Sequence, residues 1–133
     1  MIQKIHHLSI AVRSLEDALR FYRDTLGLPV HKLATQEDQG VKAALLTIGQ
    51  DEIELLEPLG PDTAVGRFLE RRGEGLHHIC LQTDDIDRDL AELKAKGVEF
   101  IDQEPRQGLA GRICFLHPRS TGGVLVELAQ PQE

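Results

Sequence analysis

Four ionisable side chains interrupt apolar segments of this chain at two pairs of equivalent places. His7 and His78 lie in the similar segments IHHLSIAV and LHHICLQT, and Glu54 and Glu127 lie in IELLEPL and VLVELAQ. A carboxylate between apolar neighbours is costly to bury unless a positive charge compensates it. Two imidazoles and two carboxylates suit a divalent first-row metal, and six-coordination leaves two positions for water or substrate. We therefore predict one divalent ion at these four residues.

Each of these histidines follows another histidine, so strand geometry has to decide which of the two points toward a site. Successive side chains of a strand point to opposite faces. The second histidine, His7 or His78, shares its face with small or polar residues such as Ser9 and Cys80. The first histidine shares its face with large aliphatic residues, which suit a face covered by a helix. We therefore select the second histidine of each pair.

For each residue taken alone, simpler interpretations stay open. A single histidine on a strand is more often at the surface or hydrogen-bonded than a metal ligand, and a glutamate usually faces solvent. The symmetrical placement of all four residues favours the metal site.

The overall charge favours a small-molecule partner. A formal net charge of -7 disfavours binding to nucleic acid or to an anionic membrane, since both require a basic surface. No apolar run is long enough to cross a bilayer and no signal peptide is evident, so we expect a cytoplasmic protein. Cys80 and Cys114 lack a CxxC spacing and are interpreted as structural free thiols.

The elements that must position the four residues occur twice along the chain. The first half begins with a strand at 5–12 and a helix capped by Ser14 and stopped at Gly27. Three strands then complete it, and they are expected at residues 28–34, 41–48 and 52–57.

The second half repeats this order from the segment LHHICLQT onward, with Asp85 as the helix cap and Gly97 as its stop. Its three further strands are expected at residues 98–102, 112–117 and 123–129. The linker between the halves contains one short helix at 62–72, for which Asp62 is the expected cap.

This order predicts an α+β fold built from two βαβββ modules in a single domain, residues 1–133. The first module spans 5–57, the linker 58–76 and the second module 77–129. Neither module alone buries much core, so we expect the two to pack together as a curved mixed sheet around a shared cavity.

The duplicated module with ligands on its first and last strands resembles the vicinal oxygen chelate superfamily of glyoxalases, bleomycin-resistance proteins and dioxygenases. Within it, GEGLHHIC, DDID, QEPRQG and DQGV resemble segments of the methylmalonyl-CoA epimerase family. The stretch FLHPRSTGGVLVELAQ is the most discriminating, and the resemblance covers nearly the whole chain.

The resemblance implies that His7, Glu54, His78 and Glu127 are the metal ligands and that Glu127 is the catalytic base. It implies an isomerase that interconverts (R)- and (S)-methylmalonyl-CoA by metal-assisted removal of the C2 proton through an enolate. Co²⁺ or Mn²⁺ is the expected ion, with Ni²⁺, Zn²⁺ and Mg²⁺ also compatible. A coenzyme A thioester substrate, a place in propionate metabolism and a homodimer are implied as well.

Two parts of the site are less determined. Many relatives carry an acidic residue at the position of Ala43, which cannot transfer a proton, so the second acid or base is not identified. Arg106 and Arg112 are among the candidates for contacts with the coenzyme A phosphates. A loop before the strand of Glu127 is expected to bind substrate, with a plain hairpin loop as the alternative. Its candidate residues are Arg119, Ser120, Thr121 and Gly122.

Other functions fit the same fold. A lactoylglutathione lyase-like isomerase would use the same metal and also remove a proton next to a carbonyl group. An extradiol dioxygenase is less favoured, because two histidines and one carboxylate would leave Glu54 without a role. A non-enzymatic drug-binding module is the third alternative, and the presence of all four polar residues argues against it.

Overall fold

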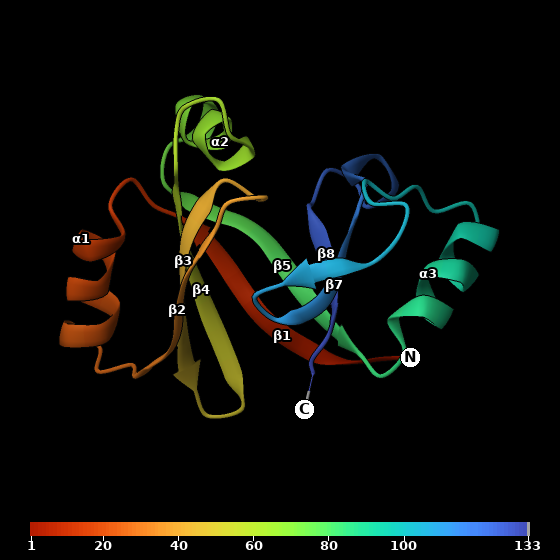
Figure 1. The fold of residues 1–133 in the computed structure, drawn as a ribbon, viewed down its shortest axis with the longest axis horizontal. Helices are drawn as coiled ribbons and strands as arrows, with labels where there is room; N and C mark the ends of the chain where they lie inside the picture. Colours follow the sequence, from red (N-terminus) through yellow and green to blue (C-terminus); the bar gives the residue numbers. More distant parts are fainter. Residues whose placement is uncertain (133) are drawn as a thin grey trace. The chain divides into compact units, whose positions relative to one another are not determined.

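The fold is given by a computed structural model that describes residues 1–132 (Figure 1). The chain divides into two compact units. The N-terminal unit is His7–His77, and the C-terminal unit consists of Met1–His6 and the chain from His78 onward. No helix in the described part of the chain is long and apolar enough to span a bilayer. The single domain expected for 1–133 stays a prediction.

In the N-terminal unit the strands pair in the order β2-β3-β4-β1, with β4 parallel to β1 and antiparallel to β3. Figure 1 shows α1 beside this group of strands. The elements from the start of the chain are β1 (Ile2–Ala11), α1 (Leu15–Leu19), the π-helical η1 (Arg20–Thr25), β2 (Val30–Gln36), β3 (Val41–Ile48), β4 (Asp51–Pro58) and α2 (Ala64–Arg72).

The first helix packs an apolar side against one face of this sheet. Ser14 caps it as predicted, because its hydroxyl accepts a hydrogen bond from the Asp17 backbone N–H at 3.1 Å. Leu15 and Leu19 are buried in a core cluster with Leu55. Beyond Leu19 the helix continues in the wider π form, a difference that the apolar spacing did not indicate.

In the C-terminal unit the strands follow the order β1-β5-β8-β7-β6, in which β5 and β8 are parallel. Only the first half of β1 belongs to this unit. Its other elements are β5 (Gly75–Thr83), which starts in the N-terminal unit, α3 (Ile86–Ala95), β6 (Arg106–Gly108), β7 (Gly111–Leu116), the 3-10 turn η2 (Pro118–Ser120) and β8 (Val126–Gln130).

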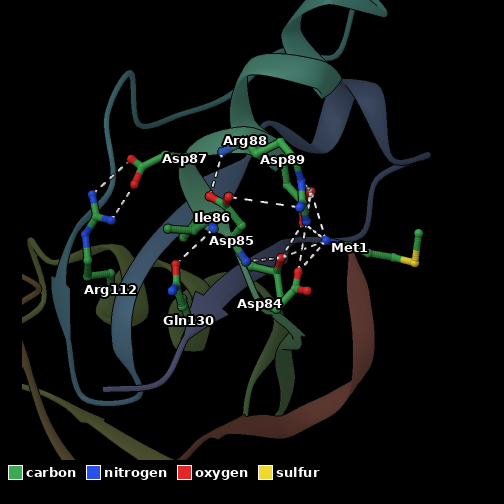
Figure 2. Close-up of polar contacts among 10 residues, drawn as sticks. Met1, Asp84, Asp85, Ile86, Asp87, Arg88, Asp89, Arg112 and Gln130 are labelled. Carbon is green, nitrogen blue, oxygen red and sulfur yellow. Dashed lines mark hydrogen bonds and ion pairs between the residues drawn. The ribbon is translucent and has the colours of Figure 1, made fainter. Parts of the chain in front are cut away.

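Polar contacts fix the start of α3 to this sheet (Figure 2). Asp85 caps the helix as predicted, and the backbone N–H of Ile86 donates to the Gln130 side chain at 3.0 Å. Arg112 donates two hydrogen bonds to Asp87, at 2.6 and 3.0 Å, from β7 to α3. The guanidinium of Arg112 lowers the pKa of the Asp87 carboxyl through these bonds. Arg112 is therefore engaged in the fold itself.

The start of β1 is held at the same corner of the unit. The α-amino group of Met1 donates to Asp84 at 2.7 Å and to Asp89 at 3.2 Å (Figure 2). Asp89 is buried and also accepts a short hydrogen bond from the Thr83 hydroxyl. Its carboxylate is therefore compensated by a donor from the strand and by a positive charge.

The strand expected at 98–102 is the main error in the predicted elements. Only Phe100 bridges to β7, opposite Leu116, and the regular partners of β7 are β6 and β8. The Asp102 side chain accepts the backbone N–H of Phe115 at 2.8 Å. The Asp102 carboxylate thus accepts the N–H group that a backbone carbonyl of a paired strand would otherwise accept. The pairing of this segment with β7 therefore ends after the single bridge at Phe100.

The cap of α2 also differs from the prediction. Thr63, and not Asp62, occupies the N-cap position, where its hydroxyl accepts the backbone N–H of Gly66 at 3.0 Å. The same hydroxyl donates to the Gly60 carbonyl oxygen at 2.8 Å. This second bond ties the cap to the preceding turn, and sequence pattern alone does not separate two adjacent capping residues.

Replacing each candidate cap tests this assignment. We expect Thr63→Ala to lower the free energy of unfolding by about 1 to 2 kcal/mol, because it exposes the helix N-terminus and removes the bond to Gly60. Asp62→Ala is the matched control and should change it by less than about 0.5 kcal/mol. Urea unfolding followed by circular dichroism measures both. A larger effect at Asp62 would contradict the assignment.

Candidate metal centre

The face of the N-terminal unit that α1 does not cover carries the predicted polar residues. Leu55 packs into the cluster with α1, so its neighbour Glu54 points to the opposite face of β4. In the parallel pairing of β1 and β4, Ser9 lies opposite Glu54. His7 is two residues from Ser9 and therefore shares this face. The strands thus gather these polar side chains on one side.

These residues form a first histidine–carboxylate pair. His7 Nε2 lies 3.4 Å from Glu54 Oε1, and the Ser9 hydroxyl donates to the same oxygen at 2.6 Å. The exposed fractions are 1% for His7, 6% for Glu54 and 0% for Ser9. A buried carboxylate therefore meets an imidazole and a hydroxyl in place of water.

The C-terminal unit contains a second pair of the same kind. His78 Nε2 and Glu127 Oε1 are 3.0 Å apart, and both residues are buried. Glu127 lies opposite Cys80 in the parallel pairing of β5 and β8, as Glu54 lies opposite Ser9 in β4 and β1. The two modules thus place an imidazole and a carboxylate at equivalent points.

Phe115 covers the second pair and was not singled out from the sequence. It lies opposite Glu127 in β7, and its ring meets the His78 ring edge to face at a centroid distance of 5.2 Å. The guanidinium of Arg106 lies over the Phe115 ring, 5.8 Å from its centroid, and pairs with Asp102 at 2.9 Å. Side chains alternate between the two faces of a strand. Matching this alternation in the predicted strand 112–117 to the face that carries Glu127 is the signal that could have identified Phe115.

The first histidine of the second pair has a different environment. His77 is half-buried and contacts Phe68 of α2, with the two ring centroids 4.9 Å apart. Within the N-terminal unit, His7 and Glu54 offer an imidazole nitrogen and a carboxylate oxygen 3.4 Å apart, and both are donor types that bind divalent ions. The donor types fit a divalent ion, since a cation would compensate the buried carboxylates.

Comparison with known proteins identifies the family. A sequence model of the Glyoxalase/Bleomycin resistance protein/Dioxygenase superfamily matches residues 6–115. An ethylmalonyl-CoA/methylmalonyl-CoA epimerase of Cereibacter sphaeroides is 40% identical over 133 residues, which cover 98% of this chain and 99% of that protein. The mitochondrial methylmalonyl-CoA epimerase of Mus musculus is 38% identical over 96% of this chain and 72% of its own. This chain belongs to the methylmalonyl-CoA epimerase family.

Solved structures of this family share the fold. A methylmalonyl-CoA epimerase of Streptomyces coelicolor, a Glu-to-Gln variant in complex with 2-nitronate-propionyl-CoA, matches with a TM-score of 0.96 and 41% identity over both whole chains. A further epimerase, in complex with methylmalonyl-CoA and NH₄⁺, matches with a TM-score of 0.94 and 42% identity, covering 98% of this chain and 96% of that chain. The predicted fold class is therefore confirmed.

Ala43, the position at which the resemblance leads us to expect an acid, stands on the same face of the sheet as Glu54. It is 1% exposed and lies opposite Leu56 in β4. Its neighbour Lys42 points to the other face and approaches Glu57 to 3.7 Å. The methyl group of Ala43 can fill space at this point but cannot exchange a proton.

The loop expected to bind the epimerase substrate uses much of its hydrogen-bonding capacity within itself. The Ser120 hydroxyl accepts the backbone N–H of Glu99, and the Thr121 hydroxyl donates to the Pro118 carbonyl oxygen. Backbone N–H groups of Arg119, Ser120 and Thr121 are bonded to His117 or Pro118. The substrate role of Arg119, Ser120, Thr121 and Gly122 stays a prediction.

The two cysteines are buried as expected. Cys80 and Cys114 are both fully inaccessible, and burial raises the pKa of the Cys114 thiol to about 12. Near neutral pH this thiol is therefore protonated, and the reactive thiolate is scarce.

Thiol titration tests this description. We expect neither cysteine of the native protein to react with Ellman's reagent at pH 8, because both sulfurs are inaccessible and Cys114 ionises only well above that pH. In guanidinium chloride both should react. Rapid modification of the native protein would contradict the burial of the two thiols. The variant Cys114→Ala would then show which cysteine reacts.

Proposed function

We propose that this chain interconverts the R and S forms of methylmalonyl-CoA. The observation that carries the proposal is the pair of buried histidine–carboxylate contacts, His7 with Glu54 and His78 with Glu127, at equivalent register in the two modules. Membership of the epimerase family supports the acyl-CoA substrate, since related structures contain methylmalonyl-CoA or a nitronate analogue.

The proposal assigns one divalent ion, with Co²⁺ or Mn²⁺ as the expected metal, to the four ligands His7, Glu54, His78 and Glu127. The donor set supports this assignment, because a cation compensates buried carboxylates and imidazole nitrogens bind such ions. When bound, the ion supplies a positive charge that stabilises the negative charge developing on the thioester oxygen as the C2 proton leaves.

Glu127 is the proposed base that accepts the C2 proton. Its contact with His78 orients the carboxylate, and the ring of Phe115 against His78 limits the access of water. Epimerisation also requires that a proton return to the opposite face of the substrate. Ala43 cannot provide it, so the proposal leaves this second step to water or to another side chain.

Substrate contacts are assigned by the same proposal to the loop of Arg119, Ser120, Thr121 and Gly122. Arg106 is a further candidate for an anionic part of the substrate, because Asp102 and the Phe115 ring hold its guanidinium on the side of Glu127. From the resemblance alone we also propose a homodimer located in the cytoplasm.

Deuterium exchange at C2 tests the activity. We expect the purified protein, incubated with (2S)- or (2R)-methylmalonyl-CoA in D₂O, to incorporate deuterium at C2 in the presence of Co²⁺ or Mn²⁺, as measured by mass spectrometry. Treatment with EDTA should abolish incorporation and added Co²⁺ should restore it. Lack of exchange with every divalent ion would rule out the epimerase, and exchange without metal would rule out the metal site.

Replacement of Glu127 tests the base. We expect Glu127→Gln to slow exchange by about 10²- to 10⁴-fold, the usual contribution of a positioned base, while the amide oxygen still permits Co²⁺ binding. Glu92→Gln, at an exposed position of α3, is the matched control and should exchange like the wild type. If Glu127→Gln binds Co²⁺ and exchanges at the wild-type rate, the base lies elsewhere.

A further inference from the structure

The two modules place different residues opposite their buried glutamates. Ser9 faces Glu54 across the parallel strands β1 and β4, and Cys80 faces Glu127 across β5 and β8. Both facing residues are completely buried. The duplicated fold therefore provides a hydroxyl at one carboxylate and a thiol at the other, although the backbone register around them is the same.

This difference changes how firmly each carboxylate is held. The Ser9 hydroxyl donates to Glu54 Oε1 at 2.6 Å, the length of a strong bond to a charged acceptor. A thiol is a much weaker donor than a hydroxyl. Because Ser9 lies away from solvent, water does not compete for its bond. Glu54 thus has one oxygen fixed by the strand opposite it.

We propose that Ser9 is a positioning residue, which holds the Glu54 carboxylate in one orientation as a permanent metal ligand. This role of Ser9 rests on the proposed function, and it gives the two glutamates different roles. Glu54, fixed by the hydroxyl, only ligates, whereas Glu127, which lies opposite a thiol, also accepts the substrate proton. Partners of metal ligands orient them in this way in many metalloproteins.

Metal affinity and the Co²⁺ absorption spectrum test Ser9 independently of activity. We expect Ser9→Ala to weaken Co²⁺ binding about tenfold or more in calorimetric titration and to change the visible absorption bands, because Glu54 loses its orienting donor. The rate of deuterium exchange at saturating Co²⁺ should fall by a much smaller factor than the Co²⁺ affinity.

The control is a second buried hydroxyl–carboxylate pair in the chain. Thr83 is 1% exposed and donates to the buried Asp89, next to α3 and outside the proposed ligand set. Thr83→Val should lower thermal stability while the Co²⁺ affinity and spectrum stay as in the wild type. The comparison separates positioning of a ligand from a general loss of stability.

The reciprocal change tests the division of roles. Cys80→Ser places a strong donor opposite Glu127, and we expect exchange to slow about tenfold or more while Co²⁺ affinity is retained. If Ser9→Ala does not fold, Ser9→Cys keeps the side-chain volume with a weaker donor and should show the same loss of affinity.

The outcomes are distinguishable. Wild-type protein that binds Co²⁺ and exchanges deuterium, together with an unchanged affinity and spectrum in Ser9→Ala, would overturn the role of Ser9 and leave the epimerase intact. Unchanged exchange in Cys80→Ser would overturn the division of roles. Wild-type protein that neither binds Co²⁺ nor exchanges would overturn the proposed function and the inference with it.

Discussion

The structure depends on the cost of burying a carboxylate away from water. Glu54 and Glu127 are 6% and 4% exposed, and each is followed in its strand by a buried leucine, Leu55 or Leu128. Such a charge is tolerated only with a compensating partner, and each glutamate has an imidazole within 3.4 Å. An apolar pair at these places would stabilise the fold as well or better. The buried charges therefore indicate a function.

The βαβββ module brings a histidine and a glutamate together through the pairing of its strands. Its first and last strands run parallel and adjacent, which places His7 and Ser9 beside Glu54, and His78 and Cys80 beside Glu127. The helix between them covers one face of the sheet, where apolar residues pack, and leaves the other face for polar side chains. Duplication of the module thus provides two buried histidine–carboxylate pairs without any new kind of contact.

The two modules differ in what surrounds each histidine–carboxylate pair. Ser9 donates a short hydrogen bond to Glu54, whereas the residue opposite Glu127 is Cys80, whose thiol is a weaker kind of donor. Phe115 and Arg106 extend the second pair, because the Phe115 ring meets the His78 ring edge to face and the Arg106 guanidinium lies over the Phe115 ring. The two histidine–carboxylate pairs therefore have different surroundings.

The sequence by itself determined the repeated order of elements, the helix caps at Ser14 and Asp85 and the four candidate ligands, because these follow from local periodicity and residue chemistry. Only the tertiary structure decided that Thr63 caps α2, that Asp102 ends a strand at 98–102, and that Ser9 meets Glu54. The Thr63 cap is a local contact, and the bond of its hydroxyl to the Gly60 carbonyl oxygen distinguishes Thr63 from Asp62. The contacts of Asp102 and Ser9 depend on the register of segments farther apart in the chain, Ser9 and Glu54 being 45 residues apart, and packing sets that register.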